Sequence, residues 1–453
     1  MRLLITLLMA FAITSHASQL KHQQNDNSFI LNNVNVVDVE NHKIHPSRTL
    51  IVKNGKIDNI LDSGSPINLT DLPIIEGKNG YITPGLIDMH VHMYEKAAYT
   101  LALNHGVTHV RIMNGLPSHL AWRHQVESGS LIGSSSTVSS PIISGFDKAY
   151  LHHTVHTAEE ARDAVRQYQS KGYDLIKAYG NLNKAALSAL IKESRKVGIP
   201  VAKHGPHGSG DMPFSQLSSL QSFEHVEDIY QGPLNYNFDL KRLQKVIPEL
   251  KATGVPVTPT LNIFYQLTKL SQEKEKYLAK TSSEYTSDII ALETSNNQLK
   301  RWLTASDNMA AHNQKTLNFL LVITKALHDA EVPLLIGSDS GVLLSPHGLA
   351  LHNEMRLFQK AGLSTFDVLA AATINAAKAL KLDKKIGKVS PQYNADFIYS
   401  SSNPINNLSV LKEPEAVVKN GYWHSRQALN IMRDKAIESR SLWEELHTLF
   451  DGL

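Results

Sequence analysis

The stretch Ile82-Thr-Pro-Gly-Leu-Ile-Asp-Met-His-Val-His92 decides the fold of this chain. Pro84 and Gly85 predict a turn, and the apolar residues that follow predict a buried strand that ends at two histidines. Side chains alternate along a strand, so His90 and His92 lie on one face, where two imidazoles can bind the same metal ion. Since the chain has 22 histidines, this pair is weak evidence until other strand ends supply further ligands.

Short apolar runs alternate with helical patterns from about Thr83 to Lys381, which is typical of a parallel α/β fold. The candidate strands are residues 86–91, 107–113, 141–144, 175–179, 200–204, 222–225, 256–261 and 334–339. Eight such strands predict a closed (β/α)8 TIM barrel, whose chemistry lies at the carboxyl ends of the strands. An open doubly wound sheet is the rival fold, but no Gly-X-Gly-X-X-Gly turn follows the first strand.

Both ends of the chain contain strand patterns that belong to a smaller β module. Residues 29–39, 50–52 and 57–61 precede the barrel, and residues 396–399 and 417–423 follow it. Asn54-Gly55 and Asn420-Gly421 are hairpin signals, because such a turn needs positive φ at both central positions. We therefore expect a small β-sandwich built from residues 18–82 and 382–453, the latter with a terminal helix, beside a barrel of residues 83–381.

Residues 1–17 have the pattern of an export signal peptide, with an apolar run after Arg2 and a small-residue cleavage site ending at Ala17. A membrane anchor is the alternative, although the run is shorter than the roughly 20 residues that a bilayer needs. The chain has no cysteine, which suits an oxidising compartment and excludes disulfides and thiolate metal ligands. We expect an exported protein, periplasmic or secreted, without stable membrane insertion once the signal is removed.

The composition favours a small molecule as the partner. The formal net charge is only +3 and no block of like charge runs along the chain, which argues against nucleic acid. Hydrophobic residues make up 42% of the chain and can supply a large core. The sequence leaves homo-oligomerisation open.

Two segments interrupt the α/β pattern. Residues 128–140 are rich in Ser and Gly and predict a long loop at the carboxyl face of the barrel, either a plain solvated loop or a substrate lid. Residues 266–314 are polar and helix-prone, and they predict a helical insertion over the same face.

Four later strand-like runs end in groups that can bind a metal, and these groups are Lys177, His204, His225 and Asp339. Lys177 lies in an otherwise apolar run, where an ammonium must be paired, neutral or modified. A carbamate formed from its neutral amine and carbon dioxide could bridge two metal ions, whereas an ion pair with a neighbouring carboxylate is the plain alternative. For each histidine the alternative is a structural role, and for Asp339 it is an Asx turn or a helix cap.

Over nearly the whole mature chain the sequence resembles the amidohydrolase superfamily, closest to the branch of imidazolonepropionase-like proteins and Xaa-Pro or Xaa-Arg dipeptidases. The resemblance is carried by residues 84–92, Lys177, His204, His225, Gly337-Ser338-Asp339, Pro346-His347-Gly348, and residues 372–377, 386–389 and 394–396. The sequence departs from the pattern at Ser338, where threonine is frequent, at Val226, where glycine is frequent, and at Pro206. The last two departures bear on the pocket floor and therefore on the substrate.

The resemblance implies a metal site, usually with two zinc ions, whose ligands would be His90, His92, Lys177, His204, His225 and Asp339. The histidines of the first strand and Asp339 would hold the more buried ion, the other two histidines the more exposed one, and a carbamate on Lys177 would bridge them. It also implies hydrolysis of a C–N amide bond by a metal-activated hydroxide, with Asp339 as ligand and proton shuttle. Some members of the superfamily work with one metal, so the number of ions stays open.

The substrate that we expect is a dipeptide or an N-acyl amino acid. A cyclic amide of imidazolone or hydantoin type, or a lactone, is the alternative substrate, and a catalytically silent small-molecule-binding barrel is the alternative outside enzymes. Four side chains just beyond strand ends, Tyr179, His207, Tyr265 and His347, could bind substrate or only brace loops. Arg111 could bind an α-carboxylate, although a structural ion pair with a barrel carboxylate is favoured.

Overall fold

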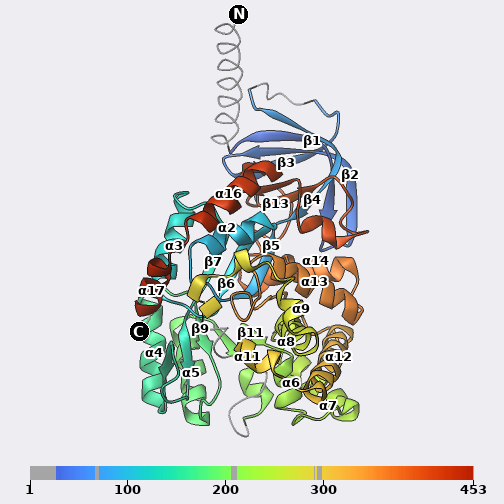
Figure 1. Cartoon of the computed structure of the whole chain (residues 1–453). Coiled ribbons are helices and arrows are strands. Elements are labelled where there is room, and N and C mark those ends of the chain that lie inside the picture. The colour runs from blue at the N-terminus through green and yellow to red at the C-terminus, as the bar shows by residue number, and fades with distance from the viewer. Residues whose placement is uncertain (1–26, 67–70, 206–211, 290, 293–297, 452–453) are drawn as a thin grey trace, which may run out of the picture.

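The computed structural model describes residues 27–66, 71–205, 212–289, 291–292 and 298–451. A mixed sheet lies at one end of the molecule, and an α/β barrel makes up the larger body beneath it in Figure 1. The expected signal peptide at residues 1–17 lies outside the described residues. No described helix is long and apolar enough to cross a membrane.

The barrel has the eight parallel positions that the sequence predicts. Seven of them are hydrogen-bonded strands: β5 (Leu86–Val91), β6 (Val107–Ile112), β7 (Ser135–Ser144), β9 (Leu175–Ala178), β10 (Val201–His204), β11 (Ser222–Glu224) and β12 (Val257–Thr258). Residues 334–340 occupy the eighth position, because Leu334 bridges to Val257 of β12 and Ser340 bridges to Val91 of β5. The (β/α)8 prediction is therefore confirmed.

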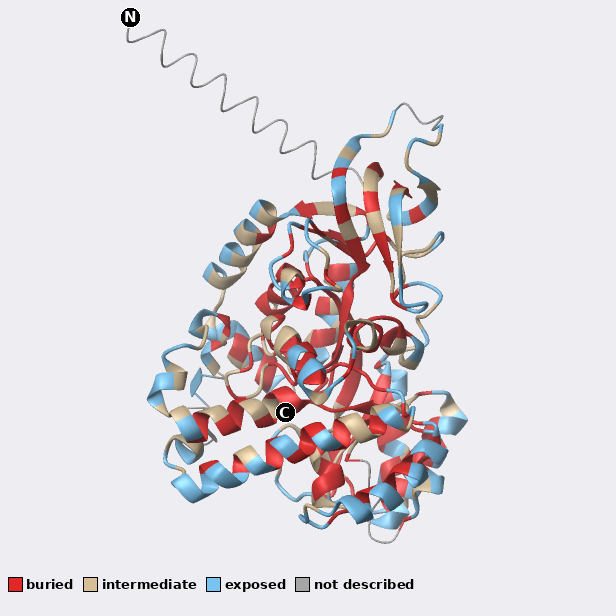
Figure 2. Cartoon of the chain, turned by 90° about the vertical axis from the view of Figure 1, so that its right-hand side faces the viewer, coloured by how far each residue is buried: buried red, intermediate tan, exposed pale blue. Residues whose placement is uncertain are grey.

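Helices surround the barrel, and most of them bury one face against it (Figure 2). They are α2 (Ala97–Asn104), α3 (Pro117–Glu127), α4 (Ala158–Ser170), α5 (Lys184–Val197), α6 (Glu227–Gln231), α7 (Leu240–Thr253), α8 (Leu261–Glu273), α12 (Asp307–Asp329), α13 (Leu349–Ala361), α14 (Thr365–Ala371) and α15 (Ile374–Ala379). Local sequence fixes their ends. Thr157 and Glu160 form a capping box at the start of α4, and Gly198 ends α5 in the left-handed conformation.

The serine-rich segment is a loop over residues 128–134 and a strand over residues 135–140, so the loop predicted over residues 128–140 is only about half as long as expected. Residues 135–140 belong to β7, and a short strand β8 (His152–Thr154) pairs with the end of β7. Buried serines are tolerated there because neighbouring main-chain groups satisfy their hydroxyls: Ser134 donates to Val107 O at 2.6 Å, and Ser140 accepts from the Lys177 N–H at 3.1 Å.

The terminal segments join in one seven-stranded sheet, as the sequence predicts for a module made by both ends. Its order is β15-β14-β13-β4-β1-β2-β3, with bounds β1 (Phe29–Asp38), β2 (Lys43–Lys53), β3 (Lys56–Asp62), β4 (Ile74–Pro84), β13 (Phe397–Ser400), β14 (Ala416–Lys419) and β15 (Tyr422–Ser425). The sheet curls, since the N–H of Ile57 donates to Tyr393 O at 2.9 Å and that of Ala395 donates to Gly55 O at 2.9 Å. It thereby encloses its own apolar core.

The predicted insertion over residues 266–314 is helical in its described part. It comprises most of α8, then α9 (Glu275–Leu278), a 3₁₀ turn η2 (Ser283–Tyr285), α11 (Gln298–Leu303) and the start of α12. After the sheet, the chain continues as α16 (Arg426–Glu438) and α17 (Leu442–Phe450). Figure 1 shows α17 beside α3, at the flank of the barrel.

Candidate metal centre

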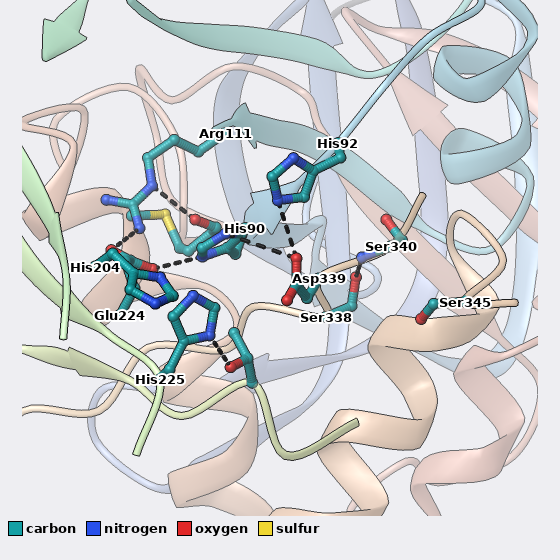
Figure 3. A network of polar contacts seen from close by, with 12 residues as sticks. His90, His92, Arg111, His204, Glu224, His225, Ser338, Asp339, Ser340 and Ser345 are labelled. Atoms are coloured by element: carbon teal, nitrogen blue, oxygen red, sulfur yellow. Dashed lines mark hydrogen bonds and ion pairs between the residues drawn. The ribbon is translucent and has the colours of Figure 1, made fainter. Parts of the chain in front are cut away.

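The predicted ligands lie at the carboxyl ends of the barrel strands (Figure 3). His90, His225 and Asp339 each offer a ligand atom, and these atoms all lie within 4.8 Å of one another. His92 lies beside them, with its Nε2 3.0 Å from Asp339 Oδ1. A single ring of strands therefore brings together side chains from distant parts of the sequence.

Three residues at these strand ends have left-handed backbone conformations, which non-glycine residues adopt at a cost. They are His225 (φ 70°), Thr260 (φ 52°) and Asp339 (φ 54°). Each conformation turns a side chain out of the regular strand alternation and toward the carboxyl face. Such strain, roughly 1–3 kcal/mol per residue, concentrates at functional sites.

Residues 334–340, which close the barrel, are anchored to its first strand, β5. Asp88 accepts the N–H of Ser338 at 2.9 Å and its hydroxyl at 2.5 Å. A threonine hydroxyl could make the same bond, so the departure at Ser338 leaves this contact intact. Further along, Gly341 lies against the main chain of His92, where an added Cβ would meet His92 O at 1.8 Å. These contacts fix the position of Asp339 along the barrel axis, beside the two histidines of the first strand.

A buried carboxylate sets the orientation and the tautomer of His90. Glu224 Oε2 lies 2.8 Å from His90 Nδ1, and Arg111 holds the other carboxylate oxygen at 2.6 Å. Burial would raise the pKa of Glu224, but the charges of Arg111 and Lys177 outweigh it and leave the pKa below its usual value. Glu224 is therefore an acceptor and His90 Nδ1 is the donor, so the lone pair of His90 lies on Nε2, 3.7 Å from Asp339 Oδ1.

A hydrogen-bond partner also determines the tautomer of His225. Its Nδ1 lies 2.6 Å from the hydroxyl oxygen of Thr260, and that hydroxyl donates its only proton to Pro259 O at 2.8 Å. Thr260 can only accept from His225, so Nδ1 carries the proton and Nε2 carries the lone pair. Burial lowers the pKa of His225 to about 4, and the ring is therefore neutral at pH 7.

Asp339 is charged although it is buried. Burial would raise its pKa, but His90 and His92 outweigh that effect and hold the pKa well below its ordinary value. Its Oδ1 has no hydrogen-bond partner of accepted geometry among the described residues. A buried carboxylate oxygen surrounded by imidazole nitrogens is in the position of a metal ligand.

Lys177 lies in β9 with 1% of its surface exposed, and its Nζ has no hydrogen-bond partner among the described residues. The ion pair with a neighbouring carboxylate, which was the plain alternative, is not among the ion pairs of the described residues. Burial lowers the pKa of Lys177 to about 8, although Glu224 opposes the shift. A large fraction of the amine is therefore neutral near pH 8.

His204, the predicted ligand from β10, stands at the edge of the group. Its ring centroid is 4.5 Å from that of His225 and 4.1 Å from that of Tyr179. His204 Nε2 lies 3.5 Å from Asp228 Oδ2, whereas its Nδ1 has no partner among the described residues. The structure thus places His204 and Tyr179 side by side but directs His204 toward an acid that follows β11.

The remaining predicted residues have different surroundings. His347 is buried and shares a hydrogen bond of 3.0 Å with Ser340, next to the Asp339 turn. Tyr265 lies on α8 under the Arg356 guanidinium, 4.9 Å from its ring centroid, and no described contact joins it to the ligands. His207 lies outside the described residues. Arg111 is the structural counter-ion that the sequence favoured, since it is fully buried against Glu224.

Sequence reasoning missed Glu224 and Thr260. Glu224 had a signal, because a carboxylate inside a buried strand needs a cation and Arg111 is a buried cation four barrel strands earlier in the chain. Regular alternation would have placed Glu224 and His225 on opposite faces, but the left-handed conformation of His225 brings both to the site. Thr260 had no signal, since its role depends on that same backbone geometry.

The comparisons with known proteins agree with this geometry. The amidohydrolase family model matches residues 81–423. A solved structure of bottromycin amidohydrolase is 20% identical, covers 92% of this chain and 91% of its own, and has a TM-score of 0.76. A putative prolidase from Bifidobacterium longum is 21% identical, with coverage of 90% and 98% and a TM-score of 0.71. A Xaa-Pro dipeptidase with bound methionine is 17% identical, with coverage of 88% and 100% and a TM-score of 0.67.

The fold and the donor atoms together define a barrel hydrolase whose site lies at the carboxyl ends of the strands. The chain belongs to the amidohydrolase family, because the family model covers most of its length. It is therefore a hydrolase that acts on carbon–nitrogen bonds. The likeness to the solved structures shows the fold, and the comparison with curated protein sequences gave no match.

Proposed function

We propose that this chain is an exported, metal-dependent amidohydrolase that cleaves the amide bond of a dipeptide. One observation carries the proposal: two neutral histidines with lone pairs on Nε2, and the charged Asp339, present their ligand atoms within 4.8 Å of one another. Acceptor atoms that face one another without a proton between them are stabilised by a cation. Export rests on residues 1–17 and is tested by sequencing the amino terminus of the mature protein.

The residues present fit a divalent metal, and zinc is the ion that we propose. His90, His225 and Asp339 would hold it, with His92 as a further ligand. His204 and a carbamate on Lys177 would complete a second site, which the unpartnered Nζ of Lys177 and its pKa of about 8 support. When bound, the metal supplies a Lewis acid and lowers the pKa of water toward 7.

The chain's own residues supply proton transfer and binding. Asp339 is charged and lies at the centre of the ligand group, so it can accept a proton at a carboxylate oxygen and donate it to the departing amine. Tyr179 keeps its proton, since burial raises its pKa to about 12. Its hydroxyl can therefore donate a hydrogen bond to a substrate carbonyl oxygen next to His204.

Two acids beside the site favour a dipeptide over an N-acyl amino acid. Glu227 and Asp228 begin α6, with only Val226 between them and His225, and Asp228 Oδ2 lies 3.5 Å from His204 Nε2. Burial raises the pKa of each acid to about 7, and a nearby cation would reverse that effect. The free amine of a dipeptide is such a cation, whereas an acylated amine is neutral.

The test is to measure metal content and hydrolysis together. Protein purified without chelators is analysed for metal, and the zinc-loaded protein is assayed on dipeptides, on the same dipeptides with acetylated amines, on hydantoin-like rings and on lactones. We expect at least one metal per chain and release of amino acids from free dipeptides, with loss of activity on chelation and recovery with zinc.

The Asp228→Asn variant tests whether Asp228 binds the free amine of the substrate. The variant is expected to raise KM for free dipeptides and to leave the acetylated compounds unaffected. Faster cleavage of rings or lactones than of any dipeptide would overturn the dipeptide assignment. Less than about half a metal per chain, in a site with four or more protein ligands, would favour the silent barrel.

A further inference from the structure

Thr260 follows the seventh barrel strand and connects it to His225 of the candidate metal centre. It lies between β12 and α8, has 5% of its surface exposed, and has a left-handed backbone conformation. Its hydroxyl accepts from His225 Nδ1 at 2.6 Å and donates to Pro259 O at 2.8 Å. The only proton of this hydroxyl is therefore used, and the hydroxyl accepts from His225.

A carboxylate from a distant helix holds the chain in this conformation. Glu354 of α13 is fully buried and accepts the N–H of Leu261 at 2.9 Å on one oxygen and the N–H of Asn262 at 2.6 Å on the other. These are the first two N–H groups of α8, which have no partner within the helix. Glu354 thus caps α8 from outside and fixes the turn at Thr260.

Asn262 connects this turn to the segment that carries Asp339. Its side-chain amide donates to Ser338 O at 2.9 Å and also to Ser345, while Asn353 of α13 donates to its carbonyl oxygen at 2.6 Å. One buried network therefore contacts both His225, through Thr260, and the residue before Asp339. None of its members is a predicted ligand.

We propose that Thr260 is a positioning residue that holds His225 as the tautomer with a free Nε2, and that Glu354 and Asn262 keep Thr260 in place. Without an acceptor at Nδ1, His225 can move its proton to Nε2 or rotate, and either change removes one donor from the centre. The proposal rests on the metal site of the proposed function but on no particular substrate. Partners that orient a metal-binding histidine typically contribute 10-fold to 100-fold in metal affinity.

The experiment compares Thr260→Val, Thr260→Ser and a matched control, Thr268→Val. Thr268 is a fully buried threonine within α8, and its hydroxyl donates to Phe264 O at 2.7 Å inside the helix. Zinc affinity is measured by competition with a chromophoric chelator. The ¹⁵N shifts of His225, assigned by comparison with His225→Gln, report its tautomer in the metal-free protein.

Thr260→Val is expected to weaken zinc binding 10-fold to 100-fold and to increase the Nε2–H tautomer of His225. Thr260→Ser keeps the hydroxyl and is expected to restore both quantities to within about 3-fold of wild type. Thr268→Val is expected to change neither. If Thr260→Val does not fold, Glu354→Gln, which loses one acceptor for the α8 N–H groups, is expected to shift the same two readouts in the same direction.

Two results would overturn the proposal. One is an unchanged tautomer and zinc affinity in Thr260→Val, and the other is an equal loss in Thr268→Val, which would make the effect one of packing. A wild-type protein that binds zinc but cleaves no amide would instead refute the proposed function and leave the positioning role intact. If the wild-type protein binds no zinc, the tautomer of His225 in the variants still decides whether Thr260 positions this histidine.

Discussion

Asp339 combines features that a ligand and a proton shuttle both require. It is charged, nearly buried and surrounded by imidazoles, and its main chain is held by Ser338 and Gly341 on either side. Replacing it with asparagine keeps one oxygen in place but removes the group that can accept a proton. Substitution of Asp339 can therefore separate its role in metal binding from its role in catalysis.

Asp339→Asn is expected to lower kcat by two to four powers of ten while most of the metal is retained, because general acid–base catalysis contributes about that much. Steady-state kinetics on the best dipeptide and metal analysis of the same sample check the prediction. Turnover near that of wild type would rule out Asp339 as the shuttle. A parallel loss of metal would show that the carboxylate acts mainly as a ligand.

The candidate ligands could be predicted from the sequence, whereas among their supports only Glu224 had a signal there. Each candidate ligand ends a strand-like apolar run, and the carboxyl ends of parallel barrel strands share one face, so topology predicts that His90, His225 and Asp339 lie close together, as they do. The roles of Glu224 and Thr260 depend on left-handed turns at His225 and Thr260. Local sequence gives no indication of such turns at non-glycine residues.

At the level of the strands, β6 and β11 are joined across the barrel interior by one buried ion pair. Arg111 Nη2 lies 2.6 Å from Glu224 Oε1, and Arg111 also donates to Met89 O at 2.6 Å and to Ser222 at 2.7 Å. Removing one partner of such a pair leaves an uncompensated buried charge. The pair therefore supports both the barrel and the orientation of His90.

Arg111→Met is expected to lower the free energy of unfolding by about 3–5 kcal/mol, measured by urea denaturation. Lys251→Met is the control, since Lys251 is half exposed and pairs with the exposed Glu331 at 2.9 Å. Loss of that pair is expected to cost at most about 1 kcal/mol. Equal effects in both variants would mean that the interior pair contributes no more than a surface contact.

The helices at the end of the chain hold a segment that borders the site. Glu445 of α17 accepts the N–H of Ile289 at 2.8 Å and of Asp288 at 3.3 Å, and Arg440 pairs with Glu95 at 2.7 Å. The neighbouring residues 285–287 line a small cavity together with Gly341 and His347. The carboxyl-terminal helix therefore fixes part of the wall beside Asp339.

Glu445→Gln is expected to accelerate amide exchange at residues 288–289 by about one order of magnitude, because a charge-assisted hydrogen bond is worth roughly 1.5–3 kcal/mol. Hydrogen exchange with mass spectrometry measures this directly. Glu444→Gln, an exposed neighbour on the same helix, serves as the control and is expected to leave exchange unchanged. Protection equal to wild type in the Glu445 variant would exclude this anchoring role.

At the scale of the whole molecule, the sequence predicted the number and arrangement of the strands better than it predicted where each strand begins and ends. The eight barrel positions and the joint terminal module follow from strand spacing and from the Asn-Gly hairpins, and the structure contains both. The serine-rich half of β7 was missed because polar residues in a buried strand depend on partners elsewhere in the fold. The contacts of Ser134 and Ser140 come from β6 and β9, which no local pattern reveals.

The central strand of the terminal sheet has a consequence for the order in which the protein is made. β4 pairs with β1 on one side and with β13 on the other, yet β13 begins roughly 300 residues after β4 ends. At about 5–20 residues per second, a ribosome needs roughly 15 to 60 s to deliver that second neighbour. Throughout this interval the N–H and C=O groups along one edge of β4 lack their final partner strand in the nascent polypeptide, and an unpaired strand edge favours aggregation.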